Sequence, residues 1–257
     1  MNSAEEPLPL DLLARPAERW SRSDRRRLTR ISTDLRLPHE TFPLARTMKR
    51  VIHAHVGPTN SGKTHHALEA LASAASGVYC GPLRLLAFEI HDRLNSGSVP
   101  CTLRTGQELI EVANSQHTAC TVEMTSLQRP LEVGVLDEVQ MLSHPERGWA
   151  WSRVVLGLPA RQLHVCGSAD ALPLIRSLVE ACGDELVEHH YERLTPLSVT
   201  DSLNGDLSRV RRGDCVVAFS RREIFQLKQK VEEATGLRCG VVYGSLPPET
   251  RRAQARI

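Results

Sequence analysis

An eight-residue segment, GPTNSGKT at residues 57–64, constrains the fold of this 257-residue chain more than any other feature. It consists of Gly57, Pro58, Thr59, Asn60, Ser61, Gly62, Lys63 and Thr64, and it follows an alternating apolar stretch at 51–56 that is typical of a β-strand. Two glycines five residues apart let backbone N–H groups curl around a phosphate, and a helix beginning at Lys63 adds positive potential. Lys63 can then contact the β- and γ-phosphates, and Thr64 can ligate Mg²⁺. The segment predicts a strand, a phosphate-binding loop and a helix that together bind a nucleoside triphosphate.

The chain from residue 51 to about 193 alternates short apolar strands with helices. We expect strands near 51–56, 77–81, 101–104, 119–123, 132–136 and 162–166, and helices near 63–75, 83–95, 147–157 and 170–182. Such alternation predicts an α/β fold with a mostly parallel sheet and helices on both faces.

Three parts are expected along the chain: a helical or irregular N-terminal extension at 1–47 with a helix near 17–36, a nucleotide-binding domain at 48–194, and a second α/β domain at 195–257. In the last part, the patterns predict strands at 213–220 and 240–243, a helix at 221–235, and a helix that begins near Pro248. A lobe matching the first needs roughly 100–150 residues, so we expect the second domain to be partial.

Composition excludes some classes of protein. No apolar run approaches the roughly 20 residues that span a bilayer, so no membrane partner is expected. The net charge of +2 permits nucleic-acid binding without predicting it. Seven isolated cysteines, with no C-x-x-C pair, disfavour a disulfide framework or a zinc site and favour a reducing compartment. Because the acidic N-terminus fits neither a secretory signal nor a transit peptide, a bacterial cytoplasm is expected, with the mitochondrial matrix as the alternative.

A pair of acids follows the most apolar of the predicted strands. Asp137 stands at the carboxyl end of that strand, where open α/β sheets bind their ligands. We expect Asp137 to hold Mg²⁺ together with Thr64, and Glu138 to orient or deprotonate an attacking water. A surface turn is the usual interpretation of an isolated Asp-Glu pair, but the strand before it and the phosphate-binding loop favour catalysis.

Six short motifs resemble those of one family: GPTNSGKT at 57–64, GVYCGPLRLLA at 77–87, CTVEM at 120–124, DEVQ at 137–140, RGWAW at 147–151 and YGSLPP at 243–248. In this order they resemble the suppressor-of-Var helicase of the mitochondrial degradosome and its bacterial relatives, within helicase superfamily two. The resemblance covers about residues 50–257. It implies two RecA-like lobes, ATP and Mg²⁺ as cofactors, and unwinding of RNA, sometimes also of DNA, from 3′ to 5′.

The resemblance also implies roles for particular residues. Residues 57–64 would be motif I, 137–140 motif II and 166–168 motif III, and the catalytic set would be Lys63, Asp137, Glu138 and Gln140. Candidate nucleic-acid contacts are Arg84 in motif Ia, Thr121 in motif Ib, and Ser220 and Arg221 in motif IV. The expected partners are RNA, either single-stranded or duplex with a single-stranded tail, and an exoribonuclease. Motifs V and VI would lie beyond residue 257, so we expect this chain to bind ATP but to turn it over slowly.

Two other functions remain open from the sequence. A kinase of the thymidine kinase type also has a GP…SGKT loop and a DE-x-Q box, but it carries a four-cysteine zinc site that this chain lacks. A non-catalytic protein that binds ATP and RNA is the second alternative. Measuring ATP turnover with and without single-stranded RNA distinguishes the kinase and the non-catalytic protein from a helicase.

Overall fold

The computed structural model describes residues 21–26 and 37–257, and the chain divides into two compact units, 1–195 and 196–257. Residues 22–26 are helical, and the rest of the helix expected at 17–36 lies outside the described residues. Two short elements, η2 (Pro38–Thr41) and α3 (Pro43–Arg46), precede the sheet of the first unit. No helix among the described residues is both long and apolar enough to cross a membrane.

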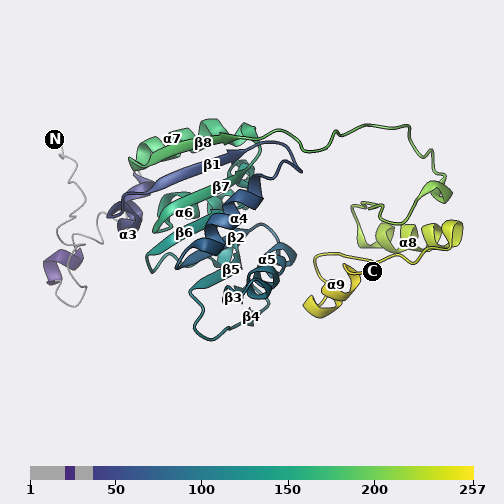
Figure 1. The fold of residues 1–257 in the computed structure, drawn as a ribbon, viewed down its shortest axis with the longest axis horizontal. Coiled ribbons are helices and arrows are strands. Elements are labelled where there is room, and N and C mark those ends of the chain that lie inside the picture. Colours follow the sequence, from purple (N-terminus) through teal and green to yellow (C-terminus); the bar gives the residue numbers. More distant parts are fainter. Residues whose placement is uncertain (1–20, 27–36) are drawn as a thin grey trace. The chain divides into compact units, whose positions relative to one another are not determined.

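The first unit is built on an eight-stranded sheet. Its strands are β1 Val51–Val56, β2 Gly77–Gly81, β3 Cys101–Arg104, β4 Leu109–Ile110, β5 His117–Thr121, β6 Leu131–Leu136, β7 Ala160–Gly167 and β8 Glu185–His190. They lie in the order β4-β3-β5-β2-β6-β7-β1-β8, from bottom to top in Figure 1, and only the β3–β4 pair is antiparallel. The expected α/β fold with a mostly parallel sheet is confirmed.

Helices cover both faces of this sheet. They are α4 Lys63–Ser73, α5 Arg84–Ser96, α6 Gly148–Gly157 and α7 Leu172–Cys182. Leu71 of α4 and Ile90 of α5 pack in one apolar cluster, and Trp151 of α6 and Ile175 of α7 pack in another. Because successive strand residues point to opposite faces, one sheet supplies both clusters. The core therefore consists of two layers separated by the sheet.

Strand register sets the position of the phosphate-binding loop. β7 lies between β1 and β6, and Val56 at the end of β1 pairs with Gly167 at the end of β7. Leu136 at the end of β6 pairs with Val165 in β7. The residues that follow β1 and β6 are therefore brought to the same edge of the sheet, on either side of the carboxyl end of β7.

Every strand and helix expected between residues 51 and 182 is present, with ends that differ by at most two residues. The strand expected at 119–123 ends at Thr121, because Val122–Met124 forms the 3-10 helix η3. Two strands were not expected, β4 and β8. β8 is an edge strand whose six residues read ELVEHH and are half-buried or exposed, so it lacks the apolar run of a central parallel strand.

The second unit contains the 3-10 helix η6 (Leu207–Arg209), α8 (Arg221–Thr235) and α9 (Pro248–Gln254). α8 begins at a capping box in which the Ser220 side chain accepts from the Glu223 backbone. It ends at Thr235 and is followed by Gly236, whose φ of 69° suits glycine. Both helices agree with the expected ones.

The strands expected at 213–220 and 240–243 were wrong, since neither segment pairs with another strand. Some backbone N–H groups of these two segments donate to side chains and not to a neighbouring strand. The N–H of Phe219 donates to the Glu223 carboxylate at 3.2 Å, and the N–H of Val241 donates to the Gln254 side chain at 2.9 Å. An apolar run indicates what a segment would bury, but a strand also needs a neighbour for its backbone groups.

Candidate nucleotide site

The phosphate-binding loop joins β1 to α4 and depends on both of its glycines. The Gly57 N–H donates to the Gly167 carbonyl at 3.1 Å, and a Cβ on Gly57 would lie 2.6 Å from the Tyr191 carbonyl oxygen. Gly62 has a φ of 80°, which an L side chain rarely adopts, and nothing lies within 4 Å of where its Cβ would be. Gly57 is therefore required by close packing and Gly62 by backbone conformation.

Polar groups of the loop have few partners of their own. The Lys63 side chain is nearly buried, and its amine donates to the Pro58 carbonyl at 3.0 Å across the loop. The Ser61 hydroxyl is buried and has no hydrogen-bond partner in the described chain. Buried polar atoms normally find partners. A phosphate group held by the loop would supply acceptors for both, so these residues fit a nucleoside triphosphate.

Asp137 follows β6 directly, and the residue is 7% exposed. One carboxylate oxygen accepts from the Glu138 backbone at 3.0 Å and lies 3.4 Å from the Thr64 hydroxyl; the other accepts from the Tyr79 hydroxyl at 3.0 Å. Burial raises the pKa of Asp137, although the Glu138 N–H, the Tyr79 hydroxyl and the Lys63 charge act in the opposite direction. A hard cation beside Thr64 and Asp137 would compensate this buried charge, and their oxygen ligands suit Mg²⁺.

Glu138 and Gln140 connect the end of β6 to the end of β7. Glu138 has a φ of 51°, which is uncommon for a residue other than glycine, and it precedes the 3-10 helix η4 (Val139–Ser143). The Gln140 amide donates to the Glu138 carboxylate, and its oxygen accepts from the Ser168 N–H at 3.1 Å. A Cβ on Gly167 would lie less than 3.0 Å from that oxygen. Gln140 thus orients Glu138 and ties it to the strand that pairs with β1.

The candidate nucleic-acid residues fall in both units. Arg84 begins α5 and is half-buried, whereas Thr121 ends β5 and is 8% exposed. In the second unit, Ser220 caps α8, and the Arg221 guanidinium lies 5.9 Å from the ring centre of Tyr243. Arg84 follows β2 and Thr121 ends β5, and these parallel strands are neighbours, so both residues lie at the carboxyl edge of the sheet.

Sequence reasoning missed two residues that hold Asp137 in place. Tyr79 is 1% exposed in the middle of β2, and Trp151 of α6 is fully buried and donates its indole N–H to the Asp137 carbonyl at 2.9 Å. Both lie in apolar patterns, where an aromatic residue indicates core packing. The one signal in the sequence was that the Tyr79 hydroxyl and the Trp151 indole N–H need hydrogen-bond partners when buried, which indicates a role beyond packing.

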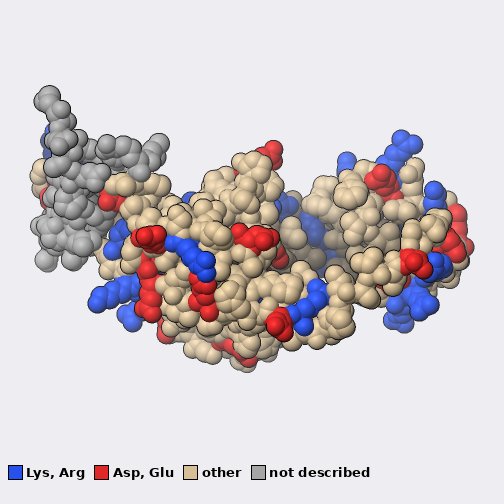
Figure 2. Space-filling view, turned by 90° about the horizontal axis from the view of Figure 1, so that it is seen from above, with Lys and Arg blue, Asp and Glu red and all other residues tan. Residues whose placement is uncertain are grey.

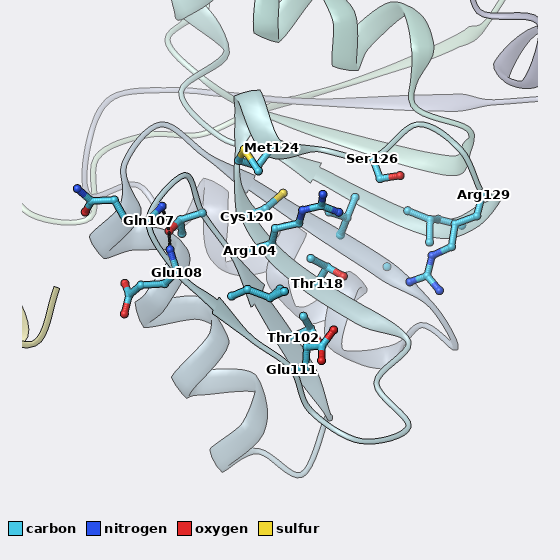
Figure 3. Close-up of a pocket in the computed structure, with 15 residues that line it drawn as sticks. Thr102, Arg104, Gln107, Glu108, Glu111, Thr118, Cys120, Met124, Ser126 and Arg129 are labelled. Carbon is cyan, nitrogen blue, oxygen red and sulfur yellow. Dashed lines mark hydrogen bonds between the residues drawn. The ribbon is translucent and has the colours of Figure 1, made fainter.

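A separate hollow of about 660 Å³ lies beside β3 and β5. Figure 3 shows Arg104 over the middle of this hollow, near Cys120, and Arg129 at its far side. No residue of the phosphate-binding loop lines it. On the surface seen in Figure 2, acidic and basic side chains are interspersed, in keeping with the small net charge.

Comparison with known proteins points to one family. The family model for the DEXQ-box helicase domain of Suv3 matches residues 38–191. The mitochondrial ATP-dependent RNA helicase SUV3L of Oryza sativa is 54% identical over 227 residues, which are 88% of this chain and 31% of that protein. The mitochondrial ATP-dependent RNA helicase SUPV3L1 of Homo sapiens is 48% identical over 228 residues, which are 87% of this chain and 29% of that protein. The chain therefore spans about a third of the length of these relatives.

Proposed function

Because the chain belongs to the Suv3 family of DEXQ-box helicases, we propose that it binds ATP with Mg²⁺ and acts in ATP-dependent unwinding of RNA. The observation that carries this proposal is that residues following β1 and residues following β6 meet at one edge of the sheet. There the Thr64 hydroxyl lies 3.4 Å from the Asp137 carboxylate, beside a buried Lys63 amine and an unpartnered Ser61 hydroxyl. The family assignment disfavours the thymidine kinase alternative.

Each residue then has a distinct role. Lys63 and the backbone of the phosphate-binding loop bind the β- and γ-phosphates, and Thr64 and Asp137 hold Mg²⁺, which offsets charge on the phosphate oxygens. Glu138 takes up a proton from the attacking water, and Gln140 keeps the Glu138 carboxylate oriented. The low exposure of Lys63 and Asp137 supports these roles, since electrostatic interactions are stronger away from water.

For the nucleic acid, we propose contacts at Arg84 and Thr121 of the first unit and at Ser220 and Arg221 of the second. The named activity of the relatives supports RNA as the substrate, with a single-stranded segment as the part bound. An exoribonuclease partner belongs to the same proposal, on family resemblance. The relatives are named as mitochondrial, which does not support the expected bacterial cytoplasm; we therefore propose the mitochondrial alternative.

Binding of a fluorescent ATP analogue tests the nucleotide site. Lys63→Ala is expected to lose affinity, because it removes the amine that lies across the loop, while the matched control Lys49→Ala, at an exposed position ahead of β1, keeps it. Parental affinity in Lys63→Ala would refute the site. ATP turnover measured with and without single-stranded RNA then decides the activity: stimulation by RNA supports a helicase, and binding without turnover supports a non-catalytic protein.

A further inference from the structure

Arg147 makes contacts that join two segments otherwise far apart in sequence. Its guanidinium donates to the Glu123 carboxylate at 3.0 and 2.8 Å and to the Pro82 carbonyl at 2.8 Å. Pro82 lies two residues before Arg84, and Glu123 lies two residues after Thr121. One side chain therefore holds both segments that carry the candidate nucleic-acid contacts of the first unit.

The same guanidinium also reaches toward the nucleotide site. Its carbon lies 5.2 Å from the ring centre of Trp151, close enough for a cation–π contact. Trp151 is fully buried and donates to the Asp137 carbonyl at 2.9 Å. Three contacts, Pro82 to Arg147, Arg147 to Trp151 and Trp151 to Asp137, thus link the Pro82 carbonyl to the backbone of Asp137. We call this set, Arg147 with Glu123, Pro82 and Trp151, the Arg147 bridge.

The start of α6 keeps the bridge in contact with the turn that carries Glu138. The Gly148 N–H donates to the His144 carbonyl at 2.8 Å, directly after η4. A Cβ on Gly148 would lie less than 3.0 Å from the Leu142 carbonyl oxygen, so the helix packs tightly on η4. Movement of the Asp137–Gln140 turn would therefore be transmitted to α6, and through Arg147 to Pro82 and Glu123.

A second arginine of the same helix provides a contrast. Arg153 donates to the carbonyls of Glu123 at 3.2 Å and Thr125 at 2.8 Å, so it also anchors η3. None of its hydrogen bonds is to Pro82, and its guanidinium makes no cation–π contact with Trp151 in the described chain. Arg153 can fix one segment, whereas Arg147 connects both segments to the Asp137 backbone.

We propose that Arg147 is a positioning residue that couples nucleotide binding to nucleic-acid binding, a proposal that rests on the function proposed above. It holds the end of β2 and the end of β5 in the arrangement that the Asp137 turn dictates. Lysine cannot replace it, because one ammonium group lacks the planar fork by which the guanidinium reaches Glu123 and Pro82 and also contacts the Trp151 ring. Thermodynamic linkage requires the coupling to act equally in both directions.

The test compares the parent 257-residue chain with Arg147→Gln, Arg147→Lys, Arg153→Gln and the exposed control Arg176→Gln. The dissociation constant of single-stranded RNA is measured with and without a non-hydrolysable ATP analogue and Mg²⁺. Hydrogen exchange of residues 81–86 and 121–126 is measured with and without the nucleotide. Coupling between two sites typically changes affinity by about 5–150-fold.

In the parent and in Arg176→Gln, nucleotide is expected to change RNA affinity at least about fivefold and to alter exchange in both segments. In Arg147→Gln and Arg147→Lys, the ratio of the RNA dissociation constants without and with nucleotide falls toward one, and nucleotide no longer changes hydrogen exchange at 81–86. Arg153→Gln keeps the exchange response at 81–86. The bridge is refuted if Arg147→Gln keeps the parental ratio and exchange response, or if it only lowers the melting temperature and weakens both ligands equally. Absence of RNA binding in a parent that binds nucleotide would instead refute the proposed function, and exchange would still decide the bridge.

Discussion

Lowering the pH from 7.5 to 5.5 is expected to destabilise the first unit, because four histidines stack on one face of its sheet. The ring centres of His55 and His189 are 4.6 Å apart, those of His53 and His164 are 4.6 Å apart, and those of His55 and His164 are 5.1 Å apart. The His55 ring nitrogens contact the Tyr191 hydroxyl at 2.8 Å and His164 at 2.9 Å. Because His55 and His164 are both buried, a charge on either ring would face other imidazoles rather than water.

Burial lowers the pKa of His55 to about 3 and that of His164 to about 4, and the neighbouring histidines act in the same direction. The unfolded chain, with a histidine pKa near 6.5, takes up protons first, so stability falls as the pH drops below about 6.5. Because pH 5.5 lies one unit below the unfolded pKa, each of the two histidines lowers the free energy of unfolding by about 1.4 kcal/mol at that pH. Together, His55 and His164 are expected to lower the free energy of unfolding by about 2–3 kcal/mol between pH 7.5 and pH 5.5. This result holds for any folded pKa values below 5.5.

Urea unfolding followed by tryptophan fluorescence measures this loss, since Trp149 and Trp151 both lie in α6 of the first unit. Replacement of His164 by Gln should reduce the difference in unfolding free energy between the two pH values by about 1.4 kcal/mol. His190→Gln serves as the control, because that side chain is 64% exposed and should leave the difference unchanged. An unchanged difference in His164→Gln would show that the stacked rings do not resist protonation.

Three further changes test separate parts of the account. Glu138→Gln should keep ATP affinity while slowing phosphate release about 10²–10⁴-fold; a parental rate would assign the base elsewhere. Gly148→Ala should lower the free energy of unfolding by about 1–3 kcal/mol in urea, because its Cβ meets the Leu142 carbonyl, and a neutral result would contradict that packing. Ser220→Ala should cost α8 about 1 kcal/mol, seen as faster hydrogen exchange over 221–235, since the Glu223 N–H loses the hydroxyl that accepts its hydrogen bond.

The first unit followed from its sequence because local and tertiary signals agree there. β1 alternates apolar residues with histidines just ahead of the phosphate-binding loop, and β2 is an apolar run that begins and ends with glycine. Their ends matched the expected 51–56 and 77–81. The edge strand β8 did not follow, because its polar residues pair with β1 through backbone groups that leave no sequence pattern. In the second unit, the runs at 213–220 and 240–243 had the composition of strands but no strand to pair with.

The candidate site shows the same division. Loop residues 57–64 and Asp137 were expected from spacing, because the carboxyl ends of parallel strands share one edge, and the structure brings Thr64 and Asp137 together there. Their catalytic roles stay predictions. The contacts of Tyr79 and Trp151 with Asp137 were not predictable, since they depend on which buried aromatic lies next to which backbone group.

The dependence of ATP affinity on Mg²⁺ tests the central claim most directly, since it asks whether Asp137 and Thr64 hold the cation. ATP affinity is measured by calorimetry with Mg²⁺ and with EDTA, in the parent, in Asp137→Asn, and in the exposed control Asp92→Asn. Mg²⁺ is expected to strengthen binding at least about tenfold in the parent and the control, equivalent to about 1.4 kcal/mol, and to have little effect in Asp137→Asn. A full Mg²⁺ effect in Asp137→Asn would contradict the site proposed at the carboxyl ends of β1 and β6.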